Sequence, residues 1–311
     1  MASSKKSPLL LAVGLSLLLA LAGCDPGAGS RMVSLSTVVP ADTLARPVSY
    51  PAGALVFGFD RRLELKEDVK MYLSFLRYLE KKTGQRFLLR ISPKDRGIVD
   101  ELGGGAVHLA AIGTGSYLEA REKYGVRMLV RGLNAQGQGE YRSLVITRPG
   151  SPVQSLADLK GRTFAFGAPT STQGYLIPRI ILAEAGVDLK DLRSYDHTYS
   201  HAETANAVIS GRFDAGGVQD TLGQSLAARG LVKVIATSRY YPSSGIAVNK
   251  DVSPAVVAAV RQALLEFDPQ GRDKDDLYHW ELSEMPLGFA AAQESDYADL
   301  ATWARRFGLL P

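Results

Sequence analysis

From Leu55 onward, short apolar segments alternate with amphipathic ones, and this alternation constrains the fold more than any other feature of the sequence. Residues 55–59 form an apolar run typical of a buried strand, and residues 69–79 repeat apolar side chains at helical spacing. Further strands are predicted at residues 87–91, 107–112 and 126–130. Such alternation is typical of a mostly parallel sheet with helices on both faces. The sequence therefore predicts the α/β class.

The same pattern resumes further along the chain and predicts a second lobe. Residues 141–147 are expected to form a strand that leaves the first lobe, and residues 246–248 a strand that returns to it. We expect lobe 1 to comprise residues 51–142 and 245–311, and lobe 2 residues 143–244. Two crossing strands between two lobes form the hinge of a clamshell that closes on a ligand.

The strongest candidate for a ligand site follows the predicted strand 163–166. Ser171 and Thr172 stand at the expected start of a helix, where unpaired N–H groups and the positive end of the helix dipole favour an anion. Gly174 lets a ligand approach this helix start closely. Such a site suits an oxyanion. The alternative is an ordinary helix cap within a βα unit.

The N-terminal residues have the pattern of an export signal. Lys5 and Lys6 precede an apolar run too short to span a bilayer, and Cys24, the only cysteine, follows small residues. This arrangement resembles the lipobox of bacterial lipoproteins, which implies removal of residues 1–23 and acylation of Cys24, for example with palmitate. An export signal with an incidental cysteine, or a core helix, is the alternative.

Residues 24–50 would then join the lipid to the folded part of the chain. They are rich in small residues and proline, as a flexible tether is. We expect the protein to be anchored by lipid to the cell membrane, facing the periplasm or the cell exterior. With a single cysteine, an intrachain disulfide is impossible.

Charge and motif content argue against several function classes. Without Lys5 and Lys6, the 36 basic residues fall to 34 against 32 acidic ones, which gives no support to nucleic-acid binding. Neither a P-loop nor a metal-binding spacing occurs, so we expect no cofactor and no metal. A hydrolase with Ser171 as nucleophile, His201 as base and Asp220 as its partner is conceivable, but Ser171 lacks the G-x-S-x-G context.

A linked set of motifs gives a more specific indication. The set comprises Ser-Leu-Ala-Asp-Leu-Lys-Gly at 155–161, Ser-Thr-x-Gly-Tyr at 171–175, Tyr-Ser-His at 199–201, Gly-Arg-Phe-Asp-Ala at 211–215 and Val-Ile-Ala-Thr-Ser at 234–238. In order and spacing, over roughly residues 53 to 268, it resembles the phosphate, phosphite and phosphonate substrate-binding proteins of ABC importers. The resemblance implies a two-lobed periplasmic-binding-protein fold, a monomer that hands a small oxyanion to a membrane permease, and no catalysis.

The resemblance also assigns ligand-binding roles to individual residues. It implies that His201, whose free imidazole has a pKa near about 6.5, gives the oxyanion a charge-assisted hydrogen bond. It places Tyr141 in the pocket wall and makes Asp220 the acceptor of a hydrogen bond from a protonated ligand oxygen. Thr114, in the turn after strand 107–112, is a further candidate. The alternatives are a helix cap for His201 and Asp220, and a half-buried strand aromatic for Tyr141.

Three departures from the family pattern bear on the ligand. Arg96 stands where many relatives have a tyrosine, so it either clamps an oxyanion or lies on the surface. The turn 242–245 lacks the acidic residue that relatives binding an aminophosphonate carry, and Gln173 replaces a small residue. Two other roles keep the same fold: a ligand-sensing subunit of a membrane signalling protein, and the capture of a sulfonate, a carboxylate or another small solute.

Overall fold

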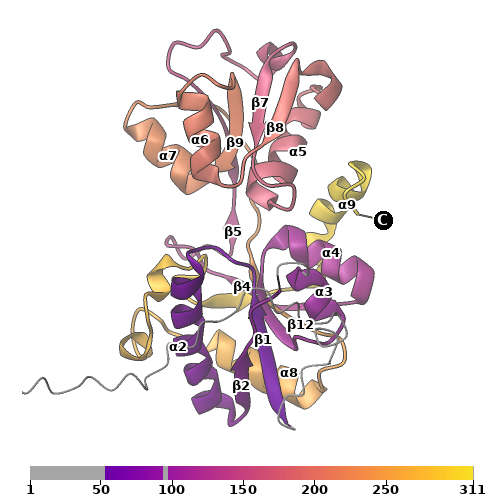
Figure 1. Ribbon diagram of the computed structural model, residues 1–311, viewed down its shortest axis with the longest axis vertical. Helices are drawn as coiled ribbons and strands as arrows, with labels where there is room; N and C mark the ends of the chain where they lie inside the picture. The colour runs from indigo at the N-terminus through magenta and orange to yellow at the C-terminus, as the bar shows by residue number, and fades with distance from the viewer. Residues whose placement is uncertain (1–52, 94–96, 311) are drawn as a thin grey trace, which may run out of the picture. The chain divides into compact units, whose positions relative to one another are not determined.

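Two sheets organise the computed structural model, which describes residues 53–93 and 97–310 (Figure 1). The first has six strands in the order β13-β4-β12-β3-β1-β2, and we call the elements around it lobe 1. Strand β1 pairs in parallel with β2 and β3, whereas β12 pairs antiparallel with β3 and β4. The strands are β1 (Ala54–Phe59), β2 (Arg86–Leu89), β3 (Leu109–Ile112), β4 (Arg127–Gly132), β12 (Gly245–Val248) and β13 (Phe289–Ala291).

The second sheet has five strands in the order β10-β6-β9-β7-β8, and we call the elements around it lobe 2. Its strands are β6 (Ser143–Thr147), β7 (Thr163–Phe166), β8 (Ser194–His197), β9 (Ala215–Gln219) and β10 (Lys233–Thr237). Strand β7 is parallel to β8 and β9, but β6 is antiparallel to β9 and β10. Both sheets are thus mixed: the strands of the βα units pair in parallel, as the sequence predicts, and other strands join them antiparallel. The strands that change lobe enter each sheet against the direction of the βα strands.

Helices flank both sheets, as the apolar periodicity predicts. They are α2 (Leu65–Thr83), α3 (Ile98–Gly103), α4 (Thr114–Tyr124) and α8 (Pro254–Leu265) in lobe 1, and α5 (Ile177–Glu184), α6 (His201–Ile209) and α7 (Asp220–Ala228) in lobe 2. Helix α2 ends at Gly84, whose φ of 66° allows its N–H to bond the carbonyl of Glu80. Its Phe75 stacks on Trp280 at 4.7 Å between ring centroids, which ties the C-terminal part of the chain to the lobe 1 core.

The chain passes between the two sheets twice, and the two passages pair with each other. Strand β5 (Glu140–Tyr141) lies just before β6, and β11 (Tyr241–Pro242) lies between β10 and β12. They form an antiparallel pair in which Tyr141 is opposite Tyr241. The predicted crossing strands are therefore present, with β5 and β6 dividing residues 140–147 between them.

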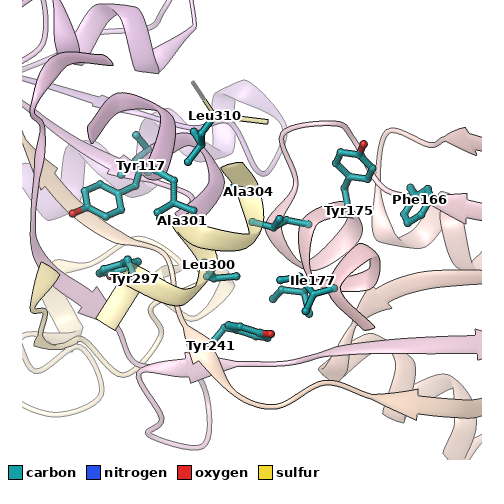
Figure 2. Packing of buried hydrophobic residues seen from close by; sticks show 14 of the residues in the cluster. Tyr117, Phe166, Tyr175, Ile177, Tyr241, Tyr297, Leu300, Ala301, Ala304 and Leu310 are labelled. Carbon is teal, nitrogen blue, oxygen red and sulfur yellow. The ribbon is translucent and has the colours of Figure 1, made fainter. Parts of the chain in front are cut away.

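Helix α9 (Ala298–Arg306) gives the lobes a third connection. Its preceding residue Tyr297 packs against Tyr117 of α4, with ring centroids 4.8 Å apart. Leu300 and Ala304 belong to the same buried cluster as Ile177 of α5 (Figure 2). Contacts from one short helix to both α4 and α5 thus link lobe 1 to lobe 2 away from the crossing strands.

A buried ion pair fixes α3 to the end of β2. Glu101 has a fully buried side chain and receives two hydrogen bonds from Arg90, Nε to Oε2 at 2.5 Å and Nη2 to Oε1 at 2.7 Å. Glu101→Ala removes a buried carboxylate together with both of these charge-assisted hydrogen bonds, so we expect a loss of about 3–5 kcal/mol in the free energy of unfolding. Urea denaturation measures the loss. Glu119→Ala, which breaks a half-exposed pair with Lys123, should cost under about 1 kcal/mol, and equal losses in the two variants would contradict the prediction.

Several sequence-based expectations lie outside the described residues. These are the signal at 1–23, Cys24 with the tether at 24–50, and Arg96. Within residues 53–93 and 97–310, none of the helices combines the length and the apolar character needed to cross a bilayer.

Candidate functional site

A cavity of about 660 Å³ is lined by residues of both lobes. Lobe 1 contributes the segment after β1, the start of α4 and the loop before β13, and lobe 2 contributes the starts of α6 and α7 and the turn after β7. Six of the predicted ligand-binding residues line it: Thr114, Tyr141, Ser171, Thr172, His201 and Asp220. The cavity thus brings together side chains up to 106 positions apart in the sequence, from Thr114 to Asp220.

Ser171 and Thr172 stand where a single turn of π-helix, η2 (Thr172–Leu176), leads into α5. Ser171 is the N-cap, and its Oγ accepts a hydrogen bond from the Gly174 N–H at 2.9 Å. The helix-cap alternative is therefore correct as a description of Ser171. Capping uses the oxygen as an acceptor, however, so the hydroxyl hydrogen remains for a further acceptor in the cavity.

Gly174 holds this turn tightly against its neighbours. A Cβ atom at this position would lie 2.9 Å from the Cα of Gly167 and 2.9 Å from the Oγ of Ser171. It would also lie 3.2 Å from Cε1 of His201. Glycine therefore lets the Ser171 turn and the start of α6 come together, which is the close approach expected from the sequence, although the neighbours are protein atoms.

Thr172 joins the two lobes. Its hydroxyl oxygen accepts a hydrogen bond of 2.7 Å from the N–H of Gly115 in the first turn of α4. On the lobe 1 side, Tyr141 donates to the hydroxyl of Thr114 at 2.8 Å, and Thr114 donates to the carbonyl of Pro242 at 3.1 Å. Burial raises the pKa of Tyr141 to about 12, so the phenol keeps its proton as a donor at neutral pH. These bonds align the start of α4 with the Ser171 turn.

His201 is the first residue of α6, and the cap of this helix is Ser200, whose side chain accepts from the Glu203 N–H. The Nδ1 atom of His201 is buried and has no hydrogen-bond partner among the described residues. Burial lowers the pKa of His201 to about 4; nearby Glu284 acts in the opposite direction and Arg62 in the same one. The expected titration near 6.5 is therefore wrong for the free protein, in which the imidazole is neutral at pH 7.

Asp220 begins α7, but the residue in the cap position is Gln219, so the helix-cap alternative for Asp220 is wrong. One carboxylate oxygen accepts from the N–H of Thr221 at 3.0 Å, and the other lies 4.0 Å from Nε of Arg142. The side chain is only 15% exposed. The carboxylate of Asp220 thus lies at the cavity wall beside the guanidinium of Arg142.

Three charged residues at the site escaped the sequence reasoning: Asp60, Arg62 and Glu284. Asp60 and Arg62 follow β1 directly, and the carboxyl end of a parallel strand is where ligand-binding residues gather, so the signal was available. Glu284 lies far beyond Asp220, the last of the ligand-binding residues that the sequence suggested, and its only signal is spatial. Asp60 accepts from the Gly113 N–H at 2.8 Å, and burial raises its pKa although Arg62 opposes the rise.

Glu284 also bears on the turn 242–245, which itself lacks an acidic residue. Ser244 in that turn donates to Oε2 of Glu284 at 2.6 Å. A carboxylate is therefore present beside the turn, supplied by a distant part of the chain, and it is already paired with Arg62 at 3.1 Å. Among residues 53–93 and 97–310, no group of three or more His, Cys, Asp or Glu side chains is arranged to hold a metal ion.

The sequence profile of one family matches residues 63–297, well over half of the 311 residues. This family is described as ABC transporter, phosphonate, periplasmic substrate-binding protein. The chain belongs to this family. The resemblance inferred from the motifs is thereby confirmed, and the α/β fold with two lobes agrees with it.

Two curated relatives of the phosphonate substrate-binding family align with parts of the chain. The phosphonates-binding periplasmic protein of Escherichia coli K12 is 28% identical over 157 residues, which cover 49% of this chain and 46% of the relative. The phosphate-import protein PhnD of Mycolicibacterium smegmatis is 27% identical over 212 residues, covering 62% and 66%. The aligned region therefore spans less than two thirds of each relative.

A solved structure of the same fold is PhnD1 of Prochlorococcus marinus, determined in complex with methylphosphonate. It superimposes with a TM-score of 0.67 and 18% identity, covering 82% of this chain and 98% of that protein. At this identity the likeness establishes the fold. It shows that the family's two-lobed architecture accounts for almost all of the described part of this chain.

Proposed function

We propose that this member of the family captures a small oxyanion (phosphate, phosphite or a phosphonate) between its lobes and delivers it to an ABC importer. The observation that carries the proposal is the convergence of Ser171, Thr172 and His201 on one cavity at adjacent helix starts. Hydroxyls and N–H groups at helix starts are donors that match a tetrahedral oxyanion. We further propose roles in binding for Gly174, Tyr141, Thr114 and Asp220, as the sequence suggested, with Arg96 as an additional candidate.

The lobe boundaries and the absence of catalysis belong to the same proposal. Lobe 1 comprises residues 51–142 and 245–311, and lobe 2 residues 143–244; membership of the two sheets supports this division. A catalytic triad is disfavoured because no hydrogen bond joins Ser171 to His201, or His201 to Asp220, in the described part of the chain. We expect the protein to act as a monomer.

A thermal-unfolding screen tests the function. Phosphate, phosphite or methylphosphonate should raise the melting temperature, because a ligand that binds only the folded state stabilises it in proportion to the logarithm of its concentration. Methanesulfonate, a carboxylate and arginine serve as comparison compounds. Stabilisation by the sulfonate or the carboxylate alone would assign the cavity to another solute, and a melting temperature unmoved by any oxyanion would reject the proposal.

We also propose that Cys24 is acylated after residues 1–23 are removed, and that residues 24–50 tether the lobes to the membrane. The signal pattern and the sole cysteine support this. Cys24→Ser should move the protein from the membrane pellet to the soluble fraction of cells that express it, while the purified variant binds the same oxyanion with unchanged affinity. Wild-type protein found wholly in the soluble fraction after export would contradict lipidation.

A further inference from the structure

Arg62 lies at the lobe 1 wall of the cavity, and among the described residues its guanidinium forms an ion pair with one carboxylate. Its Nη1 lies 3.1 Å from Oε1 of Glu284. Its Nη2 lies over the start of α4, because a Cβ atom at Gly113 would be only 2.7 Å from it. The side chain is 39% exposed and lines the cavity. A guanidinium carries five N–H donors, so several remain to face a ligand.

Among the described residues, the lobe 2 wall of the cavity carries no arginine or lysine. The donors of lobe 2 are uncharged, among them the hydroxyls of Ser171 and Thr172 and the imidazole of His201, which is neutral at pH 7. Arg62 and His201 interact electrostatically, since the charge of Arg62 contributes to the lowered pKa of His201. The two side chains therefore belong to facing walls of the same space.

The cavity carries more acidic than basic side chains. Its acidic residues are Asp60, Glu140, Asp220, Glu281 and Glu284, and its arginines are Arg61 and Arg62. Carboxylates repel an oxyanion, and the repulsion grows in proportion to the charge of the ligand. Both arginines have exposed side chains, but the ion pair with Glu284 fixes Arg62 at the cavity wall, so Arg62 is the cation placed to offset the repulsion.

We propose that Arg62 is a ligand-binding residue that grips the oxyanion from lobe 1 while Ser171 and Thr172 hold it from lobe 2, and that it makes the site prefer a doubly charged oxyanion. The inference rests on the proposed function and adds to it the residue that sets charge preference. A planar guanidinium donates two parallel hydrogen bonds to a phosphoryl group, which hydroxyls and a neutral imidazole cannot replace.

Glu284 is a positioning residue for the guanidinium of Arg62. One of its oxygens accepts from Ser244 at 2.6 Å, and the other is paired with Arg62, so the carboxylate fixes the guanidinium beside α4. The carboxylates of Glu284 and Asp60 raise the pKa of Arg62 against the opposite effect of burial, which keeps the cation charged. Glutamine at position 284 can still accept from Arg62 while removing the competing negative charge.

Isothermal titration of the mature chain with methylphosphonate and methanesulfonate at about pH 8.5 tests the inference, because the phosphonate then carries close to two charges and the sulfonate one. Arg62→Met should weaken methylphosphonate binding by roughly tenfold to a hundredfold and methanesulfonate binding by at most about threefold. Arg62→Lys keeps the charge without the fork and should fall between wild type and Arg62→Met. Glu284→Gln should leave methylphosphonate binding equal or tighter.

The remaining outcomes separate a binding role from a structural one. Arg86→Met, which removes an exposed arginine of β2 outside the cavity, should match wild type. If Arg62 served only as the partner of Glu284, Glu284→Gln would lose as much affinity as Arg62→Met, and that result overturns the inference. Methylphosphonate bound equally by wild type, Arg62→Met and Arg62→Lys also overturns it, while the proposed function stands. Wild type that binds no phosphonate, phosphate or phosphite overturns the proposed function, and this inference with it.

Discussion

Ser171→Ala or Thr172→Val should weaken binding of phosphate or methylphosphonate by roughly tenfold to a hundredfold, because each change removes a hydrogen bond to a charged group. Both hydroxyls accept a hydrogen bond from a backbone N–H, at Gly174 and Gly115, and each keeps its own hydrogen to donate to a ligand. Isothermal titration measures the loss. Gln224→Ala and Lys274→Ala, both on exposed positions outside the cavity, should bind as wild type does.

His201→Ala should weaken binding by a similar factor, and the pKa of His201 predicts how its contribution depends on pH. The folded pKa of about 4 lies below the unfolded value of about 6.5. The neutral imidazole therefore contributes stability to the free protein above about pH 6.5, and this contribution is lost as pH falls through about 4. A bound dianion favours the imidazolium, so the contribution of His201 to affinity should grow as pH falls below neutral toward the free-protein pKa of about 4. Variants that lack Ser171, Thr172 and His201 together and still bind would show that this turn is only a helix cap.

Gly115→Ala should prevent the lobes from closing. A Cβ atom there would lie 2.6 Å from the carbonyl oxygen of Thr170 and 3.2 Å from Oγ1 of Thr172, so α4 would have to move away from the Ser171 turn. That movement would break the 2.7 Å bond between the Gly115 N–H and Thr172. We expect affinity to fall at least about tenfold, since a separated lobe 1 no longer contacts the ligand.

Solution scattering distinguishes this effect from a local one. Ligand should reduce the radius of gyration of wild type, as hinge closure requires, and should leave that of Gly115→Ala nearly unchanged. Lys123→Ala, at an exposed position near the end of α4, is the matched control and should close normally. Full closure of Gly115→Ala at saturating ligand would show that the contact between Gly115 and Thr172 is not part of the closing movement.

The sequence predicted the features that depend on neighbouring residues. Helix and strand periodicity is local, so the α/β alternation and the start of a helical segment at Thr172 could be read directly. The pairing of β12 with β3 and β4 is not local, and nothing in residues 245–248 shows that these pairings are antiparallel. The antiparallel insertion of β12 was therefore not predicted.

The residues of the cavity likewise divide into those with a local signal in the sequence and those without one. Ser171 stands in a recognisable turn, but Glu284 reaches the cavity only because the chain after α8 folds back beside Ser244. The pKa of His201 depends on how deeply α6 is packed, which composition and spacing do not reveal. Arg62 had a local signal at the end of β1, but its ion pair is with Glu284, which is 222 positions further along the chain.

The position of α9 makes Trp303 an intrinsic fluorescent probe of the contact between the lobes. The chain has two tryptophans: Trp280 is 2% exposed within the lobe 1 core, whereas Trp303 is half-buried on α9. Phe307, whose ring lies 5.4 Å from that of Trp303, also stacks under the guanidinium of Arg179 from lobe 2. We therefore expect a rotation of the lobes to alter the polarity around Trp303 and to leave that around Trp280 unchanged. Trp303→Phe should abolish a ligand-dependent change in tryptophan fluorescence, and titration of the native emission then reads domain rotation without any attached label.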